Sequence, residues 1–337
     1  MLSGRYRLVR VETRELGRTG RQVSVVGLGT WQLGADWGQV TEKDAWSVLD
    51  AAVDAGVTFF DTADVYGDGR SEQVIGAFLR ARPDAAATVA TKMGRRAAQT
   101  PENYRLDHFR DWTDRSRRNL GVDVLDLVQL HCPPTAVYST DAVYDALDTL
   151  VAEERIAAYA VSVETCDEAL AAIARPGVAS VQIILNVFRR KPLGLVLPAA
   201  AARGVAVIAR VPLASGLLSG RYTRETVFAA EDHRTYNRHG EAFDQGETFS
   251  GVDFETGVAA AREFAGLAVP GATPAQTALR WIIQQPGVTT VIPGARSAEQ
   301  AMANAAAAAV PALPETTLDA VEDLYTRLVK PQVHHRW

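Results

Sequence analysis

Sulfur is scarce in this chain. Its 337 residues include two cysteines, Cys132 and Cys166, and three methionines. Neither cysteine has the spacing of a metal site, and the adjacent histidines His334 and His335 do not make one either. We therefore predict no bound metal, and two isolated cysteines suit a reduced, cytoplasmic location.

Long apolar runs are also missing. The charge-free segment 300–314 is rich in alanine, interrupted by prolines and too short to span a bilayer. The first fifteen residues lack the apolar core of a signal peptide. We expect no membrane partner.

The chain has no block of lysine and arginine, and its formal net charge is −5. This balance argues against a nucleic-acid partner. With 47% hydrophobic and 22% charged residues the composition is that of a soluble globular protein. The length allows one large α/β domain or two smaller ones.

Short apolar runs alternate with longer helical patterns along most of the chain, which is typical of a parallel sheet built from βα units. Each run is almost continuously apolar, as expected for strands covered on both faces. The eight runs are 23–29, 57–61, 87–92, 124–131, 156–163, 180–186, 205–210 and 288–294. Helical patterns occupy 43–55, 71–80, 105–120 and 141–152, with helix starts predicted at Thr41 and Ser71.

Eight such units fit a (β/α)8 TIM barrel. The alternative is an open doubly wound sheet, but its dinucleotide motif requires a third glycine after the first strand. Here Gly27-Leu28-Gly29 is followed by Thr30-Trp31-Gln32. We therefore predict a single barrel domain over 1–337, with an N-terminal hairpin at 13–24, the barrel at 23–310 and a C-terminal helix at 315–329.

The polar segment 227–254 follows the seventh run and has no strand or helix pattern. A loop of this length in a compact domain is usually functional or disordered. We expect it to cover the rim at the carboxyl ends of the strands, with a plain surface excursion as the alternative.

Three polar residues end consecutive runs: Asp61, Lys92 and His131. Tyr66 lies in the turn after the first of these runs. Singly, each has an ordinary structural explanation, such as a cap, a solvated charge or a packing residue. Together they would meet on one rim of a barrel, where active sites lie.

These four side chains suit proton donation to a carbonyl oxygen. Lys92 is expected to lower the pKa of Tyr66, and Asp61 to keep Lys92 charged and oriented. His131 can bind the same oxygen. Such a site needs a hydride donor, which no side chain supplies, so a nicotinamide cofactor is implied.

Specific motifs extend nearly end to end, from Thr13 to Ala308: GLGTWQLG at 27–34, VTFFDTADVYGDGRSEQVIG at 57–76, LDLVQLH at 125–131, PLASGLLSGRY at 212–222 and IPGARSAEQAMANAAA at 292–307. With them the chain closely resembles the aldo-keto reductase superfamily. The resemblance implies a barrel that binds NADPH across the strand ends and reduces an aldehyde or ketone to an alcohol. It also implies Tyr66 as the proton donor, with Asp61, Lys92 and His131 completing the catalytic set.

The resemblance further implies a cofactor site. Its expected residues are Thr30, Trp31, Ser162, Gln182, Arg210, Pro212, Leu213, Ser215, Gly216, Leu217, Ser219, Gly294, Arg296, Ser297, Gln300 and Asn304. The hydroxyl of Ser297 and the guanidinium of Arg296 at a helix start suit a 2′-phosphate, so NADP(H) is preferred over NAD(H). Many relatives have a basic residue where Gln300 stands.

The sequence departs from the family pattern at two positions. Val163 follows Ser162 where the family commonly has asparagine, so one bond to the carboxamide is lost or moved. Arg210 stands where the family often has an aromatic that stacks on the nicotinamide. Its planar guanidinium can stack in the same way, or it can turn away to pair with a carboxylate.

Trp31, Trp37 and Met93 are the candidate walls of a substrate pocket, although tryptophans are also ordinary packing residues. The small-molecule carbonyl substrate is not specified further. Two other functions remain alternatives: a non-catalytic, cofactor-sensing subunit of the channel-associated kind, and the reverse alcohol or sugar dehydrogenase activity. The protein can be a monomer or a homo-oligomer.

Overall fold

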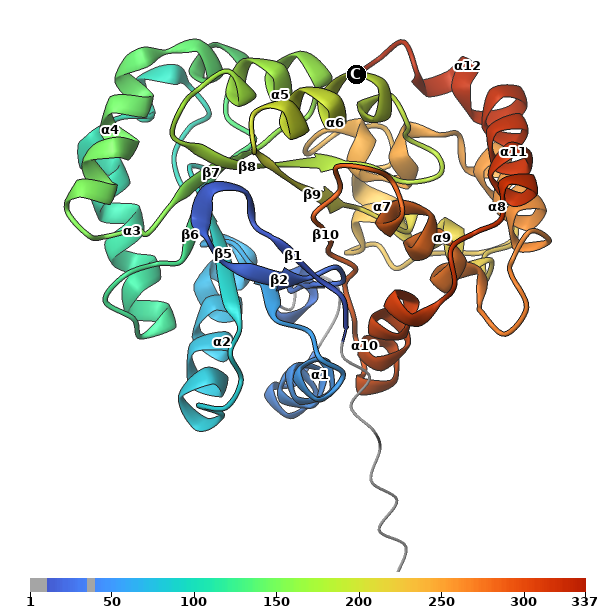
Figure 1. The fold of residues 1–337 in the computed structure, drawn as a ribbon, viewed down its shortest axis with the longest axis horizontal. Helices are drawn as coiled ribbons and strands as arrows, with labels where there is room; N and C mark the ends of the chain where they lie inside the picture. The colour runs from blue at the N-terminus through green and yellow to red at the C-terminus, as the bar shows by residue number, and fades with distance from the viewer. Residues whose placement is uncertain (1–10, 35–39) are drawn as a thin grey trace, which may run out of the picture.

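Eight parallel strands wind into a nearly closed barrel with helices outside it (Figure 1). The computed structural model describes residues 11–34 and 40–337. The sheet order is β10-β9-β8-β7-β6-β5-β4-β3. The strands are β3 Leu28–Gly29, β4 Phe59–Asp61, β5 Thr88–Met93, β6 Leu127–His131, β7 Tyr159–Ser162, β8 Val178–Ile184, β9 Ala206–Arg210 and β10 Thr290–Val291.

The barrel closes where β3 meets β10. Parallel bridges join Val26 to Val291 and Gly29 to Gly294, and the N–H of Gly27 donates to the carbonyl of Val291 at 2.8 Å. A Cβ on Gly29 would lie 2.9 Å from the carbonyl oxygen of Ile292, so a side chain there would separate the two segments. The predicted (β/α)8 barrel is confirmed.

Helices follow most strands and cover the outside of the barrel. They are α1 Glu42–Asp54, α2 Arg70–Ala81, α3 Leu106–Leu120, α4 Asp141–Ala152, α5 Cys166–Ile173, α6 Pro192–Ala202, α7 His233–Tyr236, α8 Phe254–Ala265, α9 Pro274–Ile283, α10 Ala298–Ala305, α11 Glu315–Leu324 and α12 Lys330–Val333. A π-helical turn, Tyr325–Val329, continues α11 into α12, and this C-terminal helical segment was predicted. No helix in the described part of the chain is long and apolar enough to cross a membrane.

One predicted helix start is confirmed and the other is wrong. Thr41 caps α1 in a capping box with Asp44. Helix α2 instead begins at Arg70 after Gly69, whose φ of 94° gives the turn into the helix. Ser71 lies inside the first turn, and its buried hydroxyl donates to the carbonyl oxygen of Thr30 at 3.1 Å rather than capping.

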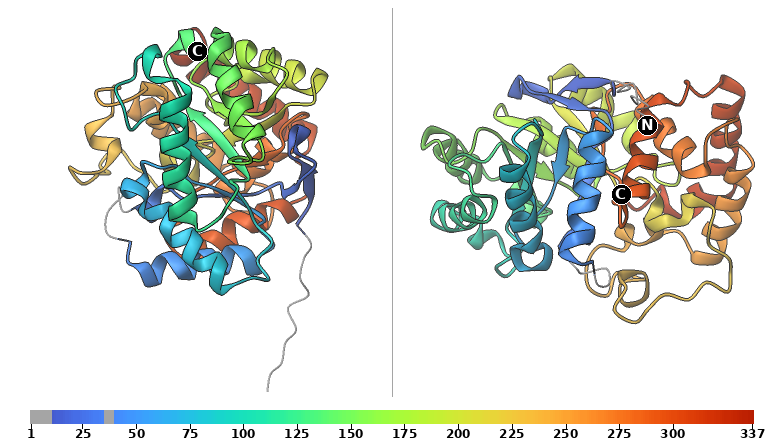
Figure 2. Two further views of the ribbon diagram at one scale, coloured as in Figure 1. Left: turned by 90° about the vertical axis from the view of Figure 1, so that its left-hand side faces the viewer. Right: turned by 90° about the horizontal axis from the view of Figure 1, so that it is seen from below.

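A hairpin of β1 Thr13–Glu15 and β2 Gln22–Ser24 lies across the amino-terminal end of the barrel (Figures 1 and 2). Its residues Leu16 and Val23 are fully buried. They pack against the inward side chains of the strands, which form one cluster: Phe59, Ala90, Leu127, Ala160, Ala179, Ala206, Ile208 and Ile292. The amino-terminal half of the barrel interior is therefore an apolar plug.

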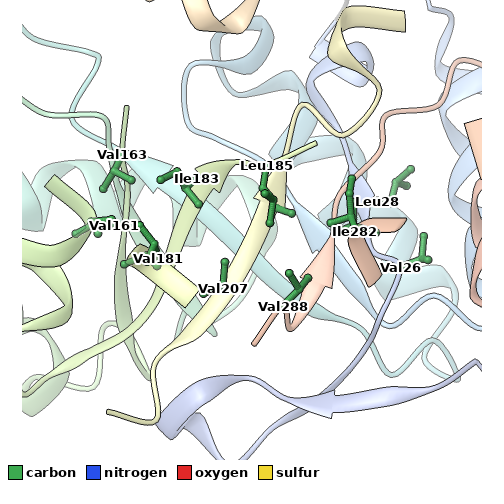
Figure 3. Packing of buried hydrophobic residues seen from close by; sticks show 14 of the residues in the cluster. Val26, Leu28, Val161, Val163, Val181, Ile183, Leu185, Val207, Ile282 and Val288 are labelled. Carbon is green, nitrogen blue, oxygen red and sulfur yellow. The ribbon is translucent and has the colours of Figure 1, made fainter. Parts of the chain in front are cut away.

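The alternate residues of the same strands point outward to the helices. Figure 3 shows Val161, Val163, Val181, Ile183 and Val207 in this outer layer. Because side chains alternate along a strand, the next inward positions lie two residues beyond the apolar plug. On β4, β5, β6, β7 and β9 these positions are polar: Asp61, Lys92, Gln129, Ser162 and Arg210.

Candidate active site

A polar layer fills the carboxyl-terminal half of the barrel. Asp61, Lys92 and Gln129 each follow an inward apolar residue of the plug by two positions. Gln129 and Gln182 donate to Oδ2 of Asp61 at 2.8 and 2.7 Å. The amide nitrogen of Gln182 also donates to Oε1 of Gln129 at 3.0 Å. Oδ2 of Asp61 is thus held by side chains from β6 and β8.

Lys92 connects this layer to Tyr66. Its side chain is 2% exposed, and Nζ lies 2.5 Å from Oδ1 of Asp61. The same Nζ donates to the carbonyl oxygen of Thr62 at 2.9 Å and to the hydroxyl of Tyr66 at 3.3 Å. The predicted proximity of Asp61, Lys92 and Tyr66 is therefore present.

A tight turn presents Tyr66 to the rim. The turn Tyr66–Gly69 contains Gly67, Asp68 and Gly69 at φ values of 57°, 52° and 94°, and Arg96 and Arg115 hold the side chain of Asp68 from outside. The Tyr66 ring meets the ring of His131 edge to face, with centroids 6.0 Å apart. The four candidate catalytic residues therefore share one rim.

The pKa of Tyr66 is raised, contrary to expectation. Burial raises it most, and the charge of Lys92 lowers it by less. The sequence showed the lysine but not how far the ring is removed from water, so the net direction was wrong. Burial also opposes the charge of Lys92, but Asp61 and Tyr66 outweigh it and raise the pKa of the ammonium group. The pair is thus a protonated phenol beside a charged lysine.

His131 is held in its neutral form. Burial lowers its pKa well below the usual value, and the charges of Arg95, Lys92 and Arg210 lower it further. Its Nδ1 atom is buried and has no hydrogen-bond partner in the part of the chain that the structure describes. A neutral imidazole at this position can donate a hydrogen bond without adding charge to the site.

Gln129 was not among the residues predicted from the sequence. It is fully buried and stands two residues before His131, so the period of a strand places both side chains on the same face. That spacing was a usable signal. Gln182, one of the expected cofactor residues, donates its amide nitrogen to Asp61 and Gln129, and its cofactor role stays a prediction.

The N-terminus of α10 contains the residues expected to bind the 2′-phosphate, and that role stays a prediction. Arg296 and Ser297 are exposed, and Ser297 caps the helix by accepting from the N–H of Gln300 at 3.2 Å. Oε1 of Gln300 accepts from the N–H of Arg296 at 2.8 Å, so this glutamine stabilises the turn. Asn304 donates to the carbonyl oxygen of Gly294 at 3.1 Å.

The segment after β9 forms the 3-10 turn Ala214–Ser219, in which Gly216 has a φ of 96°. A Cβ on Gly216 would lie 2.3 Å from the hydroxyl of Tyr222. The hydroxyl of Ser215 donates to the carbonyl oxygen of Glu247 at 2.8 Å. Of the remaining expected residues, Pro212 and Leu213 precede the turn, Leu217 is buried within it and Ser219 ends it. Their cofactor roles stay predictions.

Arg210 pairs with a carboxylate, which was the alternative given above. Its side chain forms an ion pair with Glu247 of the long segment 227–254, and its Nη2 donates to the carbonyl oxygen of Val163 at 3.0 Å. Stacking of Arg210 on a cofactor ring stays a prediction. Ser162 is buried close by, and its hydroxyl accepts from Sγ of Cys132 at 3.4 Å.

Aromatic side chains lie beside Tyr66. Trp31 stacks on it at a centroid distance of 6.0 Å, and His233 and Phe243 of the segment 227–254 contact Trp31 at 5.4 and 6.0 Å. That segment therefore reaches the rim. Met93 is 1% exposed and lies in the core, and its place in a substrate pocket stays a prediction. Trp37 lies outside the described residues. Thr30 is buried and donates to the carbonyl oxygen of Asp61 at 2.8 Å.

A buried carboxyl group underlies the Tyr66 turn. Asp64 is fully buried, and Arg96 and Arg115 bind its backbone carbonyl rather than its carboxylate. Burial, with the charge of Glu72, raises its pKa from 3.8 to about 7. At pH values between 3.8 and about 7, Asp64 holds a proton in the folded protein that it has released in the unfolded chain. Asp64 therefore makes folding less favourable as the pH rises through this window.

We expect Asp64→Asn to remove that pH dependence. Between pH 5 and pH 8 the wild type should lose about 3 kcal/mol more unfolding free energy than the variant, because roughly two pH units lie below the raised pKa and each corresponds to about 1.4 kcal/mol. Urea denaturation at both pH values measures this. Exposed Asp111 provides the control, since Asp111→Asn should follow the wild type. Parallel pH profiles for Asp64→Asn and the wild type would contradict the prediction.

Comparison with known proteins agrees with this geometry. The chain belongs to the aldo/keto reductase family, whose model matches residues 25–326. It is 27% identical to the aldo-keto reductase YhdN of Bacillus subtilis (strain 168) over 296 residues, 86% of each chain. Two solved structures are similar. The glycerol dehydrogenase AKR11B4 from Gluconobacter oxydans is 29% identical with a TM-score of 0.77, over 94% of this chain and 96% of that one. An aldo-keto reductase from Klebsiella pneumoniae in complex with NADPH is 26% identical with a TM-score of 0.70, over 94% and 95%.

Proposed function

We propose that this protein is an NADPH-dependent oxidoreductase that reduces an aldehyde or ketone to an alcohol. The observation that carries the proposal is the continuous contact from Asp61 through Lys92 to the hydroxyl of Tyr66, with His131 facing the same ring. In this proposal the whole chain acts as a single barrel domain.

The proposed roles follow from the charge states. His131, being neutral, donates a hydrogen bond to the carbonyl oxygen and orients it. Tyr66, whose pKa is raised, remains a phenol at neutral pH and donates its proton to the oxygen as negative charge develops there. Lys92 lies 3.3 Å from the phenol oxygen and stabilises the phenolate that forms. Asp61 keeps the lysine in place.

The residues at the rim fit a dinucleotide phosphate. The start of α10 offers the guanidinium of Arg296 and the hydroxyl of Ser297 at a helix N-terminus, where the backbone dipoles favour an anion. When bound, NADPH supplies the hydride. The relative from Klebsiella pneumoniae that was solved with NADPH supports this choice. We include the segment 227–254 as a cover over the cofactor, since it is bonded to Ser215 and Arg210.

A carbonyl panel with NADPH and NADH, followed by absorbance at 340 nm, tests the proposal. We expect cofactor oxidation with at least one class of aldehyde, and the corresponding alcohol and NADP⁺ should show the reverse reaction. The glycerol dehydrogenase relative makes the reverse assay necessary. Cofactor binding without turnover in either direction would favour the cofactor-sensing alternative.

Arg296→Ala should weaken NADPH binding about tenfold and leave NADH binding nearly unchanged. A charge-assisted bond contributes about 1.5–3 kcal/mol, and the exposure of Arg296 places it at the low end. Fluorescence titration of both cofactors against both proteins gives the dissociation constants. Equal losses for the two cofactors would show that Arg296 does not bind the 2′-phosphate.

A further inference from the structure

Arg95 lies on the rim beside the proposed catalytic residues but has no role among them. Strand β5 ends at Met93, and Gly94 follows with a φ of 117°. A Cβ on Gly94 would lie 2.9 Å from the ring of Tyr104, so the turn requires glycine. After this turn, Nε of Arg95 donates to the carbonyl oxygen of His131 at 3.0 Å. The guanidinium is thereby fixed against the end of β6.

Arg95 lacks the close carboxylate that two neighbouring arginines have. Arg210 is paired with Glu247, and Nη1 of Arg96 lies 2.7 Å from Asp68. Nη2 of Arg95 lies 3.6 Å from Glu164, which is beyond hydrogen-bonding distance. In the described ranges 11–34 and 40–337, no other carboxylate lies within ion-pair distance of Arg95.

Glu164 is a weak counter-ion because other groups share it. Its second oxygen lies 4.0 Å from Arg210, and its carboxyl group meets that of Asp244. Burial raises the pKa of Glu164 to about 7; Arg210 and Arg95 lower it, whereas the bond to Asp244 raises it. Near neutral pH, Glu164 is therefore protonated much of the time, and positive charge remains on Arg95.

We propose that Arg95 binds a carboxylate group of the substrate, so that the preferred substrates are aldehydes or ketones that also carry an acid group. This inference rests on the proposed carbonyl reduction. The side chain of Arg95 is 28% exposed. The hydrogen bond from its Nε to the carbonyl oxygen of His131 fixes the orientation of the guanidinium plane. A guanidinium edge binds a carboxylate in a fixed plane. His131 and Tyr66 then hold the carbonyl end, and Arg95 holds the acid end.

Matched substrates test this proposal. We would measure kcat/KM with NADPH for 3- and 4-carboxybenzaldehyde and for the uncharged amides 3- and 4-formylbenzamide. The acid-to-amide ratio cancels any general loss of activity. We expect the wild type to favour at least one acid, and Arg95→Met to lower that ratio about tenfold, because a charge-assisted bond at a partly exposed site lies at the low end of its range. Arg95→Lys should keep part of the preference.

Two controls separate a local contact from net charge. Exposed Arg118 lies on α3, and Arg118→Met removes the same charge without touching the rim. Its ratio should equal that of the wild type. In the wild type the ratio should also rise as the pH falls from 8 to 6, because protonation of Glu164 leaves Arg95 without its nearest counter-ion, while Arg210 and Asp244 keep theirs. This slope should vanish in Arg95→Met.

The product pair distinguishes failure of this proposal from failure of the proposed reaction. Calorimetric binding of the 3- and 4-(hydroxymethyl)benzoates and their amides to the protein with NADP⁺ needs no turnover. Tighter binding of a benzoate that is lost in Arg95→Met supports the anion site even if no aldehyde is reduced. Aldehyde reduction with an acid-to-amide ratio that is the same in Arg95→Met and the wild type, or that Arg118→Met lowers equally, would overturn the anion site and leave the reaction standing.

Discussion

Replacing Tyr66 with phenylalanine is expected to lower kcat for carbonyl reduction by about 10²–10⁴-fold, the usual contribution of a general acid. The hydroxyl is bonded to Nζ of Lys92 at 3.3 Å and makes the site's only proposed proton transfer. Phenylalanine keeps the stacking on Trp31 and the contact with His131. The loss should therefore fall on the chemical step, with the dissociation constant of NADPH nearly unchanged.

Single-turnover measurements of NADPH oxidation, together with cofactor titration, separate the two effects. Tyr104→Phe is a suitable control because its hydroxyl bonds to Gln99, away from Lys92. Turnover of Tyr66→Phe within about twofold of the Tyr104→Phe rate would remove Tyr66 from the mechanism.

Lys92→Met is expected to destabilise the fold by about 3 kcal/mol and to abolish most turnover. Removing one partner of a buried ion pair leaves the other charge uncompensated, which costs about 3–5 kcal/mol. Asp61 is 3% exposed, but it keeps the bonds from Gln129 and Gln182, so the loss should lie at the lower end. Urea denaturation measures the stability, and the 340 nm assay measures the rate.

The double variant Asp61→Asn, Lys92→Met identifies the cause. It removes both charges with little change in shape, so it should recover much of the stability but none of the activity. If the double variant were as unstable as Lys92→Met alone, lost packing rather than an unpaired charge would explain the effect.

The barrel and the rim were predictable because both depend on local patterns. A period of two in short apolar runs places alternate side chains in the plug and in the outer layer, and it brings Asp61, Lys92 and His131 to the same end of the sheet. Gln129 follows the same alternation, so its inward position could have been predicted from the sequence. The role of Ser71 could not, because its hydroxyl bonds to Thr30, 41 residues away in sequence.

The electrostatics of the site depended on tertiary structure. The direction of the pKa shift of Tyr66 is set by burial, which no single motif records. The pairing of Arg210 with Glu247 joins a strand end to a segment without any periodic pattern, 37 residues later. The weak pairing of Arg95 likewise follows from Glu164 being shared with Arg210 and Asp244, and these residues meet only in the folded barrel.

The seam between β3 and β10 has a consequence for how the chain reaches its native state. Val26 must pair with Val291, which lies far along the chain. Helices α1 and α10 flank the seam and pack side by side (Figures 1 and 2). Until the last of these residues leaves the ribosome, the edge of β3 has unpaired backbone groups. Such long sequence separations slow folding and expose intermediates to aggregation. During synthesis the seam can therefore form only after β10 has been made, and its closure pairs the exposed edge of β3.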